Sequence, residues 1–470
     1  MSDQVNNHHV VIIGGGPGGY AAALYGASAG LDVALVERSK VGGTCLHVGC
    51  IPAKELLETA AVFRHVRDAA QFGINTGPPT LDWSVTLERK QRIIDQLWRG
   101  LSALLKGRKV TVYEGAGRLN ADSSVTVTGA DGSATTLRAE HVVLAAGSVP
   151  RTIPGFELDG HLVTTSDEML SIERLPASAV VIGGGAIGCE FASMMADLGT
   201  RVTVLEALDK ILPGCDKDVA AVVARSFKKR GITVRTGVPV LGHRPSTDRR
   251  TTTVDFGAAE SIEVETVVVS VGRRPFADLL GLEATAVTVD QRGFVEVDAL
   301  CRTTAAGVYA IGDLIATPQL AHIAFVEGMT VIKDILGESP LPVDYERIPW
   351  AIYCHPEVAF AGYSEEQAVA KGYEVVTSQH RHAGNGRAMI IGDTDGLVKV
   401  IAEKQPDGTG GRILGVHMVG PWATEQLGQG YLAVNWEATV AEVAHFIQPH
   451  PTISELFGES MLSLTGRSLH

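Results

Sequence analysis

The stretch that decides the fold is Val10–Glu37, which reads VVIIGGGPGGYAAALYGASAGLDVALVE. A related stretch, AVVIGGGAIGCEFASMMADLGTRVTVLE, occurs at Ala179–Glu206 and aligns with the first without a gap. Each copy reads as an apolar strand, a glycine-rich turn, a helix of small residues and a second apolar strand that ends in glutamate. The repeat therefore predicts two copies of one βαβ unit.

The glycine-rich turns predict dinucleotide binding. Glycines let backbone N–H groups approach a pyrophosphate, which then lies at the positive end of the following helix. Glu37 and Glu206 follow at the spacing where a carboxylate can accept hydrogen bonds from ribose hydroxyls. A 2′-phosphate at Glu206 would meet a like charge, so the second copy favours NAD over NADP. Two turns that serve only helix–sheet packing are the alternative. The candidate turn residues are Gly14, Gly16, Gly19, Gly183, Gly185 and Gly188.

Composition narrows the class of protein. The chain has 470 residues and a formal net charge of −13, which suggests about three domains and argues against non-specific nucleic-acid binding. Six cysteines are too few for a secreted disulfide framework, so a reducing compartment, the cytoplasm, is expected. The uncharged run Val10–Leu31 contains Pro17 and seven glycines, and we predict no membrane span.

A second motif, GGTCLHVGCIPAK at residues 42–54, follows the first βαβ unit. Cys45 and Cys50 are too far apart for one straight helical face, but a turn at Val48-Gly49 can bring their sulfurs together. Pro52 is typical of a first helical turn, which places Cys50 at a helix N-terminus, where the helix field favours a thiolate. Two buried structural cysteines or half of a zinc site are the alternatives. The other four cysteines include no second close pair, so no metal site is predicted.

The cysteine motif closely resembles the redox-active disulfide segment of the flavin-dependent disulfide reductases, and the resemblance extends over essentially the whole chain. It continues through the second glycine-rich turn and four later segments. These are Gly272–Pro275, Thr304–Asp313 ending in YAIGD, Tyr353–Glu357 ending in HPE, and His450-Pro451-Thr452 followed by Glu455. The resemblance implies an α/β fold with two Rossmann-like dinucleotide-binding domains, for FAD and NAD, and a C-terminal α+β dimerisation domain that makes a homodimer. The expected division is 1–150 and 276–345 for FAD, 151–275 for NAD and 346–470 for the dimer interface.

The same resemblance implies roles for single residues. Cys45 is expected to be the interchange thiol that attacks or releases substrate, and Cys50 the thiol that faces the flavin. Lys54 and Glu190 resemble the ion pair beside the flavin's reactive nitrogen, and Asp313 the carboxylate that contacts the ribityl chain. Without the motif, Lys54 would be interpreted as a solvated helix residue and Asp313 as a turn residue. Further cofactor positions are expected at Thr44, Gly147 and Gly272.

The C-terminal segment supplies a candidate base. Pro451 followed by Thr-Ile-Ser-Glu reads as a helix start, with Glu455 in its first turns. His450 could take a proton from a dithiol and return it, while Glu455 holds the ring in its working tautomer. By resemblance, His450 reaches the disulfide of the partner subunit, which would make the dimer necessary for activity.

The implied activity is the NAD⁺-linked oxidation of protein-bound dihydrolipoyl groups, and the implied partner is a lipoyl-bearing acyltransferase subunit of a 2-oxo acid dehydrogenase complex. An NADH-dependent quinone reductase, or a reductase of another disulfide, is the alternative within the family. A scaffold without turnover is a third hypothesis, but it needs neither His450 nor the cysteines. Several residues depart from the family pattern and leave the substrate rather than the reaction type in doubt: His47, Ala53, Ala146, Phe276, Ile323, Phe325 and Gln448.

Overall fold

The computed structural model describes residues 6–470, which divide into two compact units. The first unit comprises residues 6–55, 84–151 and 272–345, and the second comprises residues 56–83, 152–271 and 346–470. Each unit contains one copy of the repeated βαβ motif. Among the described residues, no helix is long and apolar enough to cross a membrane.

The first unit is built on a sheet whose strands run in the order β3-β2-β1-β6-β5-β4, with β17 also paired to β6. β1, β2, β3, β6 and β17 are parallel, whereas β4 and β5 form an antiparallel extension. The central strands read as continuous apolar runs because both faces of a parallel sheet are covered. The strands are β1 (Asn6–Ile13), β2 (Val33–Glu37), β3 (Thr111–Glu114), β4 (Ala116–Leu119), β5 (Val125–Thr128), β6 (Ala134–Leu144) and β17 (Val308–Ala310).

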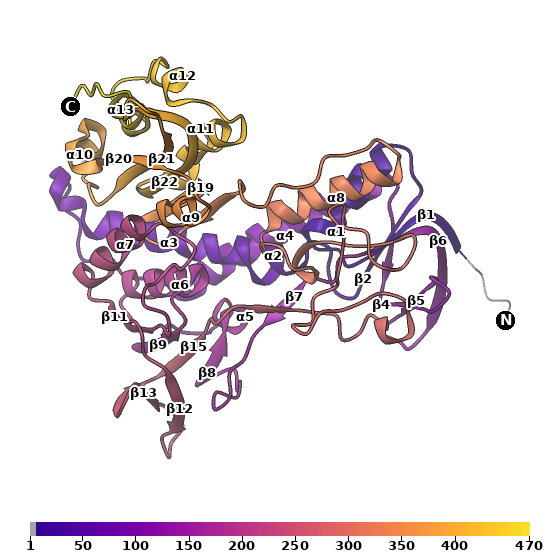
Figure 1. Ribbon diagram of the computed structural model, residues 1–470. Helices are drawn as coiled ribbons and strands as arrows, with labels where there is room; N and C mark the ends of the chain where they lie inside the picture. The colour runs from indigo at the N-terminus through magenta and orange to yellow at the C-terminus, as the bar shows by residue number, and fades with distance from the viewer. Residues whose placement is uncertain (1–5) are drawn as a thin grey trace. The chain divides into compact units, whose positions relative to one another are not determined.

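Helix α1 (Pro17–Ser28) packs against α8 (Ala321–Ile335) in this unit (Figure 1). The approach is close because a Cβ added to Gly328 would lie 2.8 Å from the Gly18 carbonyl oxygen. The unit also contains β7 (Ser148–Pro150) paired with β16 (Arg273–Pro275), α2 (Gly43–Val48), the first turn of α3 (Cys50–Arg67), α4 (Trp83–Gly107), η2 (Leu282–Ala284) and η3 (Gly312–Leu314).

The second unit contains a parallel sheet in the order β11-β10-β9-β15-β8. Its strands are β8 (Val163–Thr165), β9 (Ser178–Ile182), β10 (Arg201–Leu205), β11 (Thr233–Arg235) and β15 (Thr266–Val269), and its helices are α5 (Ser166–Met169), α6 (Ala186–Asp197) and α7 (Lys217–Lys229). An antiparallel sheet is formed by β12 (Val240–Pro245), β13 (Thr252–Phe256) and β14 (Glu260–Val264).

The C-terminal part of the second unit is an antiparallel sheet in the order β18-β19-β22-β21-β20, and α11 and α13 pack on it (Figure 1). Its strands are β18 (Pro349–Ile352), β19 (Glu357–Gly362), β20 (Val375–Arg381), β21 (Leu397–Lys404) and β22 (Gly410–Gly420). Its helices are α9 (Glu365–Ala370), η4 (His382–Gly384), α10 (Gly386–Ile391), α11 (Ala423–Asn435), α12 (Val440–Ala444) and α13 (Glu455–Leu464); η1 (Ala69–Phe72) also belongs to this unit. The predicted α/β class, with two βαβ units and a C-terminal α+β part, is confirmed.

Candidate functional site

The first glycine-rich turn, between β1 and α1, has a geometry that only glycine can adopt at two positions. Gly14 has φ +108°, and a Cβ there would lie 2.3 Å from the Ala145 carbonyl oxygen. A Cβ on Gly19 would lie 1.8 Å from the Gly14 carbonyl oxygen. Gly16 precedes α1 and supplies no side-chain cap, so no side chain at this position covers the helix N-terminus. The turn can therefore accept an anion on its backbone N–H groups.

The second turn, between β9 and α6, repeats this geometry. Gly183 has φ +105°, and a Cβ on Gly188 would lie 1.9 Å from the Gly183 carbonyl oxygen. Gly185 caps α6 at φ −72° and ψ −174°, against −70° and −174° at Gly16. Both turns therefore fit the pyrophosphate of a dinucleotide in the same way.

Glu37 and Glu206 each bind backbone N–H groups of their own turn, a role that the sequence did not predict. Glu37 accepts hydrogen bonds from the Gly15 N–H at Oε2 (2.7 Å) and from the Ser39 N–H at Oε1 (2.9 Å). Glu206 likewise accepts from the Gly184 N–H (2.6 Å) and from the Leu208 N–H (2.8 Å). Each carboxylate closes its own turn, and each oxygen keeps a second lone pair for a ribose hydroxyl.

The cysteine motif packs directly on the first turn. The Gly42 N–H donates to the Gly15 carbonyl oxygen (2.7 Å), and a Cβ on Gly43 would lie 2.6 Å from the Gly16 Cα. α2 therefore begins against the turn itself, and Thr44 is its second residue. The cysteines and the first predicted dinucleotide site form one continuous structure.

Cys45 lies in α2 and Cys50 is the first residue of α3, with the chain bending at Gly49 between them. A side-chain hydrogen bond with Cys50, together with burial, raises the pKa of the Cys45 thiol, while the charge of Lys54 acts to lower it. The two thiols are therefore in contact, and the predicted turn at Val48-Gly49 is confirmed. The Lys54 ammonium follows Cys50 by one helical turn.

Tyr20 in α1 also lies near the cysteine pair. Burial raises the pKa of its hydroxyl to about 12, and the negative charge of Cys45 and Cys50 adds to the rise. Its ring contacts that of Phe325 in α8, with ring centres 5.6 Å apart. The sequence interpretation named Phe325 as a departure from the family pattern but did not identify its aromatic neighbour.

Asp313 lies in η3 and is held by a short chain of polar contacts. The Ser148 hydroxyl donates to Asp313 Oδ2 (2.5 Å), and Arg273 Nε donates to the same hydroxyl oxygen (2.7 Å). Burial raises the pKa of the Asp313 carboxyl. Gly147 and Gly272, both at positive φ, flank Ser148 and Arg273 in the β7–β16 pair, which explains why glycine is needed there.

Glu327 is a functional candidate that the sequence interpretation missed. It is fully buried in α8 and accepts hydrogen bonds from the Gly312 N–H (2.6 Å), the Thr317 hydroxyl (2.9 Å) and the Tyr345 hydroxyl (2.9 Å). It therefore fixes the turn that carries Asp313. The sequence signal that could have identified it is a single carboxylate in the segment 321–332, which is mostly apolar.

His450 and Glu455 meet as predicted. His450 Nδ1 lies 2.8 Å from Glu455 Oε1, and the Thr452 N–H donates to Glu455 Oε2 (2.7 Å). Burial acts to raise the pKa of the Glu455 carboxyl, but these two partners hold it below its usual value. The His450 side chain is 79% exposed, so its second ring nitrogen faces outward.

Glu190 belongs to the second compact unit and Lys54 to the first. Glu190 is buried in α6, and its Oε1 accepts a hydrogen bond from the Tyr353 N–H (2.9 Å). This contact joins α6 to the YCHPE segment that begins at Tyr353.

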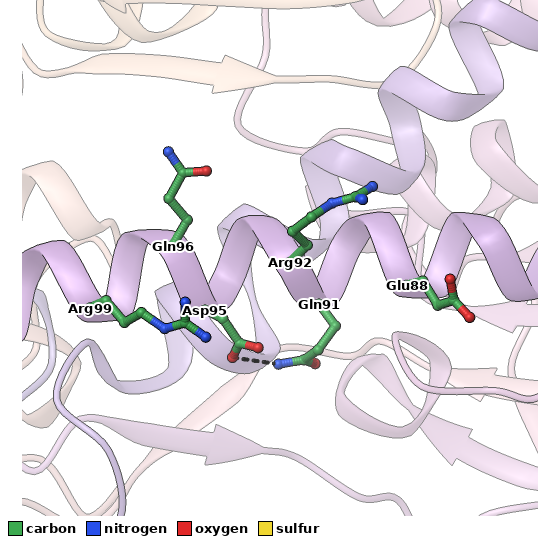
Figure 2. Close-up of a pocket in the computed structure, with 6 residues that line it drawn as sticks. All are labelled: Glu88, Gln91, Arg92, Asp95, Gln96 and Arg99. Atoms are coloured by element: carbon green, nitrogen blue, oxygen red, sulfur yellow. Dashed lines mark hydrogen bonds between the residues drawn. The ribbon is translucent and has the colours of Figure 1, made fainter.

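A hollow of about 620 Å³ lies along α4, and all six of its lining residues come from that helix (Figure 2). They are Glu88, Gln91, Arg92, Asp95, Gln96 and Arg99. Gln91 Nε2 donates to Asp95 Oδ1 (3.0 Å), and both signs of charge alternate along the surface. None of the predicted site residues lines this hollow, which is a solvated helix face. Across residues 6–470, no group of three or more His, Cys, Asp or Glu side chains is placed to hold a metal ion.

Comparison with known proteins identifies the family. Residues 8–328 match the model of the pyridine nucleotide-disulphide oxidoreductases, and residues 348–461 match the dimerisation domain of the same proteins. The chain belongs to the pyridine nucleotide-disulphide oxidoreductase family.

Two curated relatives are dihydrolipoyl dehydrogenases. That of Bacillus subtilis (strain 168) is 40% identical over 464 residues, covering 96% of this chain and 97% of the relative. That of Thermus scotoductus is 38% identical over 458 residues, covering 97% and 96%.

Solved structures agree with this fold. LpdA from Mycobacterium tuberculosis superposes with a TM-score of 0.91 at 26% identity, over 98% of this chain and all (100%) of that one. The HOCl-induced flavoprotein disulfide reductase RclA from Escherichia coli gives a TM-score of 0.85 at 26% identity, over 97% of this chain and 99% of that one.

Proposed function

We propose that the chain is a dihydrolipoyl dehydrogenase, which catalyses the reaction dihydrolipoyl group + NAD⁺ → lipoyl group + NADH + H⁺. The observation that carries the proposal is the Cys45–Cys50 thiol pair, which lies at a helix N-terminus and packs on a glycine-rich turn closed by Glu37. Relatives named for this activity match over nearly the full length of the chain.

The proposal requires FAD at the first turn and NAD at the second, and the residues present fit both. The FAD residues are Gly14, Gly16, Gly19, Glu37, Thr44, Lys54, Gly147 and Asp313. The NAD residues are Gly183, Gly185, Gly188 and Glu206, and Gly272 is a further proposed cofactor position. When bound, FAD supplies an electron-pair acceptor for the dithiol and a hydride donor for NAD⁺.

The cysteines carry out thiol–disulfide exchange. A substrate thiolate attacks the Cys45 sulfur of the Cys45–Cys50 disulfide, and the S–S bond breaks with Cys50 leaving as a thiolate. The second substrate thiolate then attacks the substrate sulfur of the mixed disulfide. This step closes the lipoyl ring and releases Cys45. Lys54, one turn after Cys50, stabilises the negative charge on the pair.

His450 is proposed to accept the proton of the first substrate thiol, to release it to solvent, and then to accept the proton of the second. Glu455 orients the ring through Nδ1 and leaves Nε2 as the proton acceptor. Because His450 is largely exposed on its own subunit, we infer that it acts at the cysteine pair of the other subunit in a homodimer. The match of residues 348–461 to the family's dimerisation domain supports this arrangement.

Three further assignments follow from the proposed activity. Glu190 would pair with Lys54 beside the flavin. The chain would divide at 1–150, 151–275, 276–345 and 346–470 into FAD, NAD, FAD and interface parts. It would work in the cytoplasm with lipoyl-bearing acyltransferase subunits of a 2-oxo acid dehydrogenase complex.

Steady-state kinetics test the proposal. Dihydrolipoamide, glutathione and a quinone are compared as substrates with NAD(H) and NADP(H) in parallel. We expect turnover of dihydrolipoamide with NAD⁺ to be the most efficient reaction. A chain that reduces quinones with NADH but does not turn over dihydrolipoamide would instead be a diaphorase, and the proposal would be wrong.

A further inference from the structure

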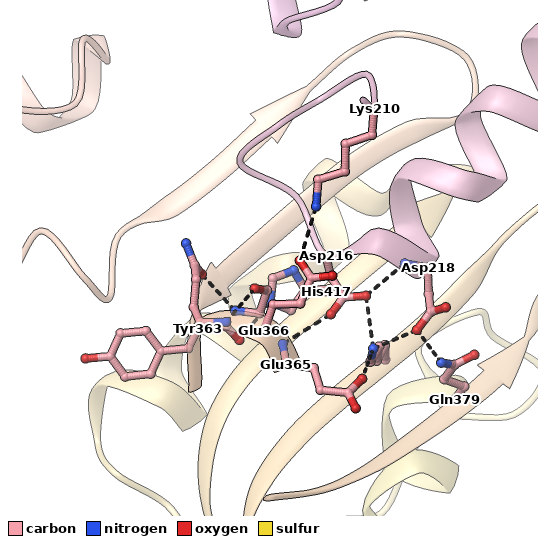
Figure 3. A network of polar contacts seen from close by, with 11 residues as sticks. Lys210, Asp216, Asp218, Tyr363, Glu365, Glu366, Gln379 and His417 are labelled. Atoms are coloured by element: carbon pink, nitrogen blue, oxygen red, sulfur yellow. Dashed lines mark hydrogen bonds and ion pairs between the residues drawn. The ribbon is translucent and has the colours of Figure 1, made fainter. Parts of the chain in front are cut away.

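The second unit contains a buried lysine that the proposed reaction does not use. Lys399 lies in β21, and its side chain has no exposed surface. Its Nζ donates to Asp216 Oδ1 (3.0 Å), Asp218 Oδ2 (2.6 Å) and Glu365 Oε2 (2.6 Å). Figure 3 shows these carboxylates converging from the start of α7 and from α9. One cation therefore holds three anions at the junction between the C-terminal sheet and the second nucleotide-binding part.

Further hydrogen bonds hold the carboxylates of this network in place. Asp216 is also fully buried; its Oδ1 accepts the Asp218 N–H (3.0 Å) as the N-cap of α7, and its Oδ2 accepts the Glu365 N–H (3.2 Å). Gln379, the neighbour of Lys399 on β20, donates to Asp218 (2.6 Å). Loss of Lys399 would leave the fully buried Asp216 carboxylate without this cation, which is costly in the interior.

Asp216 ends the segment that follows Glu206, and this segment contacts the second glycine-rich turn. The Cys215 N–H donates to the Leu212 carbonyl oxygen (2.9 Å), and the Leu212 N–H donates to the Gly184 carbonyl oxygen (2.8 Å). Leu212 has φ +52°, a conformation that costs about 1 kcal/mol or more for leucine and persists only when its surroundings impose it.

Gly184 is therefore held on both sides. Its N–H donates to Glu206, and its carbonyl oxygen accepts the Leu212 N–H. The side chain of Ile211 packs on its remaining face, since a Cβ there would lie 2.7 Å from Ile211 Cγ2. The path from Lys399 to this turn runs through Asp216 and one short turn of backbone.

We propose that Lys399 is a positioning residue for the NAD site: through Asp216 it fixes residues 207–216 so that Leu212 and Glu206 together set the glycine-rich turn. The C-terminal part of the chain would then contribute to coenzyme affinity as well as to the subunit interface. This inference rests on the proposed NAD site.

The test compares Lys399→Met with a matched control in the same place. Lys210 lies on the same segment and pairs with Glu366 of α9 (3.2 Å), but both side chains are partly exposed. Lys210→Met therefore removes a lysine between the same two elements without touching the buried network. Affinity for NAD⁺ is measured by calorimetry on the oxidised holoenzyme, in which NAD⁺ has no reductant.

For Lys399→Met we expect the Kd and the KM of NAD⁺ to rise about tenfold, with unchanged FAD absorbance and an unchanged KM for dihydrolipoamide. Lys210→Met should match the wild type. A Lys399→Met holoenzyme that binds NAD⁺ like the wild type overturns the inference alone. A wild-type holoenzyme that does not bind NAD⁺ overturns the proposed function and the inference with it.

Asp216→Asn keeps the test valid if Lys399→Met does not fold. Asparagine still caps α7, but it loses the charged bond to Lys399. We expect the same selective loss of NAD⁺ affinity. An Asp216→Asn protein with a lowered melting temperature and wild-type NAD⁺ affinity would show that the network has only a structural role, and the inference would be wrong.

Discussion

Replacement of Glu206 by glutamine tests the two roles of its carboxylate, which are to close the glycine-rich turn and to contact the ribose of NAD. In the wild type, its two oxygens accept the Gly184 N–H (2.6 Å) and the Leu208 N–H (2.8 Å), and the residue is 8% exposed. Glutamine has one acceptor oxygen, so its amide group must face the other N–H. We therefore expect one charge-assisted bond to be lost and one buried donor to remain unsatisfied.

The structure sets the size of this effect. A charged hydrogen bond with a buried partner left unsatisfied costs about 2 kcal/mol. If between half and all of this cost appears in coenzyme binding, the Kd of NAD⁺ rises roughly 5- to 30-fold. The loss of negative charge at the ribose position should also narrow the preference for NAD⁺ over NADP⁺, because the 2′-phosphate no longer meets a carboxylate.

The first turn provides the control. Glu37→Gln makes the equivalent change, at the contacts to Gly15 and Ser39, and should reduce FAD retention while the KM of NAD⁺ stays unchanged. Calorimetry with NAD⁺ on oxidised Glu206→Gln holoenzyme, with FAD absorbance measured in parallel, decides the question. An NAD⁺ Kd within twofold of the wild type would refute the role of the glutamate in holding the turn.

Three further predictions concern the cysteines, the base and acid stability. Cys45→Ser should abolish dihydrolipoamide turnover and spare quinone reduction by NADH; turnover that survives in this variant would exclude the disulfide from the mechanism. His450→Gln should lower kcat/KM for dihydrolipoamide by roughly 10² to 10⁴, measured at steady state, and a variant with full activity would refute its role as base. Burial, with the charges of Arg64 and Arg230, lowers the pKa of His355 to about 2 from 6.5. Between these two pH values the unfolded chain binds a proton that the folded chain does not. The free energy of unfolding should therefore fall below pH 6.5 by up to about 1.4 kcal/mol per pH unit. Denaturant unfolding at pH 6 and pH 5 measures this slope, which His355→Gln should flatten; an equal slope in both proteins would contradict the prediction.

The sequence predicts those features whose causes are local. Gly14 and Gly19 are required by a backbone that passes within contact distance of itself, and any chain that forms this turn needs glycine there. The bend between Cys45 and Cys50 and the helix that begins at Cys50 follow from Gly49 and Pro52 in the same way. His450 and Glu455 are five residues apart, so one turn and one helix start bring them together.

Other features depend on partners that are distant in the sequence, and the sequence alone does not predict them. Lys399 meets Asp216 across 183 residues, and nothing near Lys399 distinguishes it from a solvated lysine on a strand. Glu327 meets Gly312 only because α8 packs against η3. The sequence also does not predict that Glu206 closes its own turn, because this role is visible only from the backbone positions of Gly184 and Leu208.

The two βαβ copies agree where they share a task and differ where their tasks differ. The two copies have the same glycines in the turn and the same glutamate that closes it, and the backbone angles agree, with φ +108° at Gly14 and +105° at Gly183. One turn further along the helix, Tyr20 and Ala21 in the first copy correspond to Cys189 and Glu190 in the second. Tyr20 lies beside the cysteine pair, whereas Glu190 is buried and binds the Tyr353 backbone. The repeat therefore accounts for dinucleotide binding twice, and these two helix positions, at which the copies differ, distinguish the surroundings of the two sites.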